Sequence, residues 1–75
     1  MKVIFEGWEP GMRKIPFIEL LKEKAGLSLS EAKNIKDRLV DNGEVITLNL
    51  EDKIVAKDIV ERAKDLKVKA RIEEE

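Results

Sequence analysis

The chain has 75 residues, 43% of them hydrophobic and 41% charged, and its 15 basic and 16 acidic side chains nearly cancel. This balance creates no overall field that would attract phosphate backbones or anionic membranes, so we expect neither nucleic-acid nor membrane partners. The chain has no cysteine and no histidine, which removes the usual zinc ligands and the Ser/His or Cys/His pairs of nucleophilic enzymes. We therefore expect no metal site, no cofactor, no catalytic residue and no enzymatic activity.

The length predicts one domain over residues 1–75, and four glycines and two prolines are too few for a disordered chain. Its opening stretch is apolar for only three residues before Glu6, which is too short for a signal peptide core or a membrane-spanning helix. We expect a cytoplasmic protein that starts directly with its first strand. The acidic end, residues 73–75, is expected to fray.

The first third of the chain predicts a strand followed by a helix. Residues 2–6, KVIFE, contain β-branched and aromatic side chains and precede the turn residues EGWEPG. Pro16 then suits the first turn of a helix, and Gly26 suits its termination. We predict a helix over about 15–25.

The stretch AGLSLSEAK marks the start of a second helix. Ser28 and Glu31 have the spacing of a capping box, in which each side chain accepts a hydrogen bond from the other residue's backbone. Ser30 is an alternative cap. Apolar residues recur at helical spacing up to Asn42-Gly43, which favours a left-handed stop, so we predict a helix over 29–41.

The rest of the chain predicts a strand, a helix and a strand. EVITLNL, residues 44–50, alternates apolar and polar side chains, residues 52–67 have one apolar helical stripe, and VKARI, residues 68–72, alternates again. The order β-α-α-β-α-β predicts an α+β, two-layer sandwich in which three helices cover one face of a three-stranded sheet.

The predicted first helix has more apolar surface than one buried stripe requires. Phe17, Leu20, Leu21 and Ala25 share a face that suffices to cover a sheet, whereas Ile15, Ile18 and Lys22 lie beside it. One explanation is that Ile18 packs against the second helix and Ile15 sits at the helix entry. The other is an exposed apolar pair, bordered by Lys22 and Lys33, that docks a protein partner.

Residues 14–33, KIPFIELLKEKAGLSLSEAK, resemble the C-terminal domain of the bacterial large-subunit ribosomal stalk protein. That family has a lysine, an aliphatic helix, a Gly-Leu-Gly-Leu-like joint and Lys-Glu-Ala-Lys. The resemblance implies the same element order and a helical hairpin that recruits translational GTPases. The implied protein-binding residues are Ile15, Ile18, Glu19, Lys22 and Lys33, and we expect Leu27 of the joint to add apolar contact.

Glu19 departs from that family, which has a lysine at the matching position. A carboxylate beside Lys22 inverts the local charge and should weaken attraction for an acidic partner. The family's anchoring region and hinge have no counterpart before the first strand. We therefore expect a free-standing module that binds a protein partner through the surface of the first two helices, with a link to translation factors among the open alternatives.

Other functions remain open from the sequence. A small accessory or regulatory protein, encoded by a phage or mobile element, would act through Trp8, homodimerisation or the open sheet face, where Ile4 and Val45 are expected to point outward. Trp8 is either an anchor over the core or an exposed binding aromatic.

Two weaker resemblances complete the alternatives. VIFEGWEPGM and DNGEVITLNL are faintly similar to the adaptor that delivers N-degron substrates to the Clp protease, although its acidic motif and binding histidine lack counterparts. The Gly26-Leu27-Ser28-Leu29 joint lies where RNA-binding KH domains have a Gly-x-x-Gly loop, but it lacks the second glycine and any cation.

Overall fold

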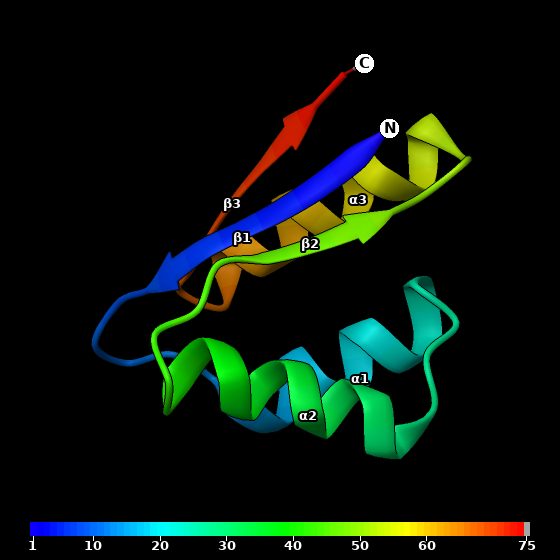
Figure 1. Ribbon diagram of the computed structural model, residues 1–75. Helices are drawn as coiled ribbons and strands as arrows, with labels where there is room; N and C mark the ends of the chain where they lie inside the picture. Colours follow the sequence, from blue (N-terminus) through cyan, green and yellow to red (C-terminus); the bar gives the residue numbers. More distant parts are fainter. Residues whose placement is uncertain (75) are drawn as a thin grey trace.

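A computed structural model describes residues 1–74 and has the predicted element order β-α-α-β-α-β. The strands are β1, Lys2–Trp8, β2, Ile46–Asn49, and β3, Val68–Glu73. They form one antiparallel sheet in the order β2-β1-β3, so β1 lies in the middle (Figure 1). The predicted α+β sandwich is confirmed.

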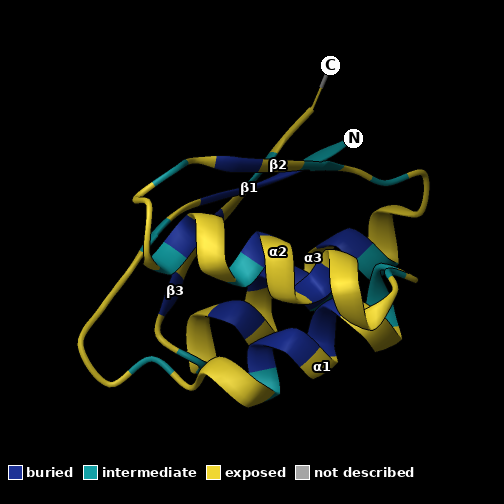
Figure 2. Ribbon diagram, turned by 60° about the horizontal axis from the view of Figure 1, so that its bottom comes forward, coloured by how far each residue is buried: buried dark blue, intermediate teal, exposed yellow. Residues whose placement is uncertain are grey.

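The three helices begin and end within two residues of their predicted limits. They are α1, Lys14–Lys24, α2, Leu29–Val40, and α3, Lys53–Asp65. All three lie on the same side of the sheet. α2 and α3 lie against the strands, whereas α1 packs against α2 and α3 on the side away from the sheet (Figure 2).

Short local signals in the sequence set the helix ends. Ser28 is the N-cap of α2: its hydroxyl accepts the Glu31 N–H, 3.1 Å away, and the Glu31 carboxylate accepts the Ser28 N–H. Ser30 lies inside the helix instead. Gly26 and Gly43 follow α1 and α2 with φ of 70° and 67°, a conformation that glycine adopts without steric cost.

The core lies between the sheet and the helices. The fully buried large side chains are Phe5, Phe17, Leu21, Leu39, Ile59, Val3 and Val68. Phe17 of α1 contacts Phe5 of β1, and their rings meet edge to face with centroids 5.3 Å apart. This contact connects the outermost helix to the central strand.

β1 is two residues longer than predicted because β3 pairs with it as far as Trp8. The register shifts between Phe5 and Gly7, so Glu6 is an extra residue on β1. Such a bulge bends and twists a strand locally. The Glu6 carboxylate also forms an ion pair with Arg71 of β3, with 2.7 Å between Glu6 Oε1 and Arg71 Nε.

The end of the chain is more ordered than the composition suggested. Glu73 is the last residue of β3, and the Glu74 carboxylate lies 3.5 Å from the Lys53 amine. The expected fraying is therefore wrong for Glu73, which pairs with Lys2 in the sheet. Glu75 lies outside the described residues.

Candidate functional site

The outward face of α1 has one large apolar side chain among charged ones. Ile15, in the first turn, is 66% exposed. Glu19 and Lys22, which lie one and two turns further along the same helix, are also exposed. An isolated exposed isoleucine is common on protein surfaces, but the helix neighbours of this one, Pro16 and Glu19, line a groove that is described below.

Ile18 does not take part in this surface. It is 5% exposed and belongs to the same core cluster as Ala32 and Ile35 of α2. The expected pair of exposed isoleucines is therefore wrong for Ile18. The reason is that α1 packs against a helix on each side, which buries a wider arc than contact with a single flat sheet would.

The remaining predicted binding residues lie on the joint and on α2. Leu27 is half-buried and packs against the core, so it offers only part of its side chain to a partner. Lys33 is exposed on α2. The structure thus leaves Ile15, Glu19, Lys22 and Lys33 accessible.

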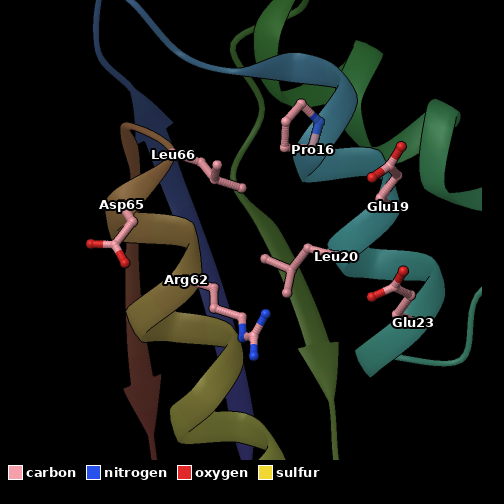
Figure 3. A pocket seen from close by; sticks show the side chains of 7 residues that line it. All are labelled: Pro16, Glu19, Leu20, Glu23, Arg62, Asp65 and Leu66. Atoms are coloured by element: carbon pink, nitrogen blue, oxygen red, sulfur yellow. The ribbon is translucent and has the colours of Figure 1, made fainter.

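A groove of about 300 Å³ runs between α1 and α3. Its walls combine apolar and charged side chains from both helices (Figure 3). The lining residues are Pro16, Glu19, Leu20, Glu23, Arg62, Asp65 and Leu66. In Figure 3, Leu20 and Leu66 point toward each other across the groove, and Arg62 points into it from α3.

Two interactions hold the walls of this groove together. At one end, the Arg13 N–H, just before α1, donates to the Leu66 carbonyl oxygen, just after α3, over 3.1 Å. At the other end, the Lys24 amine lies 3.4 Å from the Asp58 carboxylate. The start of α1 therefore lies beside the end of α3, and the two helices run antiparallel.

Arg62, the cation in the groove, is already paired. Its Nε–H donates to both carboxylate oxygens of Asp58, each 3.1 Å away and one turn earlier on α3. Hydrogen bonding from Arg62, with help from Lys24, holds the pKa of Asp58 below its ordinary value. Asp58 therefore stays ionised at neutral pH and compensates much of the Arg62 charge.

Three other carboxylates of the groove have no such partner. Within residues 1–74, no ion pair or hydrogen bond engages the side chains of Glu19, Glu23 or Asp65. Glu19 and Glu23 follow each other at one helical turn on the α1 wall, whereas Asp65 points to the outer side of α3 (Figure 3). The groove therefore has an apolar floor and a rim with an excess of negative charge.

The open face of the sheet offers less apolar surface than expected. Ile4 alternates with the core residues Val3 and Phe5, so it faces outward, but it is only 6% exposed. It lies between its strand neighbours Thr47 and Arg71. Ile4 thus faces outward as expected but is largely covered, so it offers little apolar surface to a partner.

Val45 and Trp8 are the other apolar residues that the sequence associated with binding. Val45 is 60% exposed but precedes β2, so it is not part of the sheet face. Trp8, at the end of β1, is 39% exposed. Its indole is therefore neither a sealed anchor nor a fully exposed aromatic.

Sequence reasoning singled out Glu19 but did not identify the groove in which it lies. Only the spacing of Glu19 and Glu23 and that of Asp58 and Arg62 could have indicated charged helix faces.

Within the described residues, no group of three or more acidic side chains is placed to hold a metal ion, and no helix is long and apolar enough to cross a membrane. Comparisons with protein-family models, curated proteins and solved structures found no match to this chain.

Proposed function

We propose that this chain is a protein-interaction module that docks a partner through the outward face of α1 and the adjoining α1–α3 groove. The observation that carries the proposal is that Ile15 is 66% exposed and that its helix neighbours Pro16 and Glu19 line a groove with an apolar floor. Protein interfaces combine an apolar centre with a polar, charged rim. Glu19 and Lys22 supply such a rim beside Ile15.

The proposal keeps the surface implied by the resemblance to the stalk domain but moves its centre. Ile18 is buried and contributes nothing to docking, and Glu19 opens on the α1–α3 groove. The partner surface therefore extends from α1 toward α3 as well as toward Lys33 on α2. Recruitment of translational GTPases is not required by this arrangement.

The experiment is affinity capture from host lysate with two matched variants. Ile15→Ser removes the apolar centre, and Ile54→Ser removes an isoleucine that is 80% exposed in the first turn of α3, at the opposite end of the helix pair. We expect a protein captured by the native chain to be lost with Ile15→Ser and retained with Ile54→Ser. Capture that both variants retain would overturn the proposed surface.

A further inference from the structure

We infer that the occupant of the α1–α3 groove is a basic amphipathic segment of the partner, with lysine or arginine beside an apolar side chain. This inference rests on the proposed function and adds the chemical class of the partner. It is carried by the combination of apolar floor and unpaired carboxylates described above. Neither feature alone would define the occupant.

The charge balance of the groove favours a cation. Its walls and the ion pair attached to them contain three carboxylates, of Glu19, Glu23 and Asp58, and two cations, of Lys24 and Arg62, while Asp65 points to the outer side of α3. Three negative and two positive charges leave a local charge of −1. The whole chain of 75 residues also has a net charge of −1, so this small surface is more acidic than the average.

The positions of the charges fit a helical or extended basic segment. Glu19 and Glu23 are one turn apart, which places their Cβ atoms about 6 Å from each other. Two cations of one segment could reach both carboxylates, whose pairing is not already satisfied within the described chain. Charge complementarity of this kind speeds association and excludes acidic competitors.

The floor sets the second requirement for the occupant. Leu20 is 6% exposed and Leu66 is half-buried, and the two point toward each other beside Pro16 (Figure 3). A volume of about 300 Å³ is at the lower limit of small-molecule sites. It accommodates an apolar side chain of a docked segment, with the rest of that segment on the rim.

The probe is a fluorescein-labelled peptide of about three helical turns, with lysine on one face and leucine on the other. A second peptide has glutamate in place of every lysine. Binding is measured by fluorescence anisotropy, and the site by amide chemical shifts of the labelled protein. We expect the lysine peptide to bind and to shift Glu19, Glu23 and Arg62, and the glutamate peptide not to bind.

Charge variants locate the effect. Glu19→Lys with Glu23→Lys should weaken binding of the lysine peptide by about tenfold or more. Asp41→Lys with Glu51→Lys changes the net charge equally at two exposed residues outside the groove and should change the affinity much less. Arg62→Gln should tighten binding about twofold to fivefold, because it removes a repelling cation.

Several results would overturn the inference. The two peptides could bind equally, or the two double-charge variants could lose affinity equally. Spermidine could bind as tightly as the lysine peptide. The protein could also self-associate in a way that the Glu19→Lys, Glu23→Lys variant abolishes. Failure of the peptide with intact capture through Ile15 would overturn only the basic occupant. Capture that the Ile15→Ser variant retains would overturn the proposed function itself.

Discussion

Phe17 of α1 and Phe5 of β1 meet edge to face at 5.3 Å, and both side chains are fully buried. This pair is the aromatic contact between the outermost helix and the sheet. The position of α1, and with it the groove and the exposed face around Ile15, therefore depends on a contact with the central strand.

Phe17→Leu should lower the free energy of unfolding by about 1.5 kcal/mol, because it keeps most of the buried volume but loses the ring contact. The measurement is urea denaturation followed by circular dichroism. Ile15→Leu, at an exposed position of the same helix, should change the stability by less than about 0.5 kcal/mol. Equal effects of the two substitutions would contradict the role of the aromatic pair.

Ser28→Ala should destabilise the protein by about 1 kcal/mol, because it removes the hydroxyl that accepts the Glu31 N–H at the start of α2. Ser30→Ala is the matched control. Within residues 1–74 its side chain forms no hydrogen bond, and alanine is the better helix former. Thermal unfolding of both variants should show a loss for Ser28 only; a loss for Ser30 would instead identify it as the cap.

Asp58 predicts a specific dependence of stability on pH. Its pKa is lowered in the folded state, chiefly by the hydrogen bond from Arg62. A lowered pKa stabilises the fold above the ordinary value of 3.8, and this stabilisation is lost as the pH falls through the folded-state pKa. The difference in unfolding free energy between native chain and Asp58→Asn should therefore be constant near neutral pH and shrink below pH 3.8.

Chemical denaturation at a series of pH values measures this difference. Arg62→Gln should bring the pKa of Asp58 back toward its ordinary value, as read from the side-chain carboxyl signal in an NMR titration. An unchanged Asp58 titration in that variant would show that Arg62 is not the main cause.

Lys22→Glu combined with Lys33→Glu tests how far the docking surface extends toward α2. Both lysines are exposed and, within residues 1–74, form no ion pair, so the fold should be unaffected. We expect capture of the partner to be abolished, because the reversal removes the cationic rim on the α2 side of Ile15, which lies outside the acidic α1–α3 groove and contacts a different part of the partner. Capture that resists this change but is lost with Glu19→Lys would confine the surface to α1 and the groove.

Local chemistry made the elements predictable. Ser28 with Glu31 determines the start of α2, and Gly26 and Gly43 determine where helices end. The limits that differ have tertiary causes. Val45 lies outside β2, and the preceding Glu44 accepts a 3.3 Å hydrogen bond from Arg38 of α2, a contact that the alternating pattern does not indicate.

The candidate site was less predictable because it depends on packing between distant parts of the chain. The apolar excess of α1 was visible, but the neighbour that buries Ile18 was not decided by the pattern. Glu19 and Leu66 lie far apart in the sequence and line the same groove only because α1 and α3 are held antiparallel. No periodicity within one helix reports which side of it faces a groove.

Because Glu6 is an extra residue on β1, Gly7 and Trp8 point to the opposite faces of the sheet from those that strict alternation after Ile4 would give. Ile4 faces away from the helices, and strict alternation would send Trp8 the same way. After the bulge, Trp8 is instead the direct partner of the buried Val68, and directly paired residues share a face. The pairing with Val68 therefore sets the face of the indole, and the number of residues after Ile4 does not: deletion of Glu6 would restore regular alternation and leave Trp8 opposite Val68.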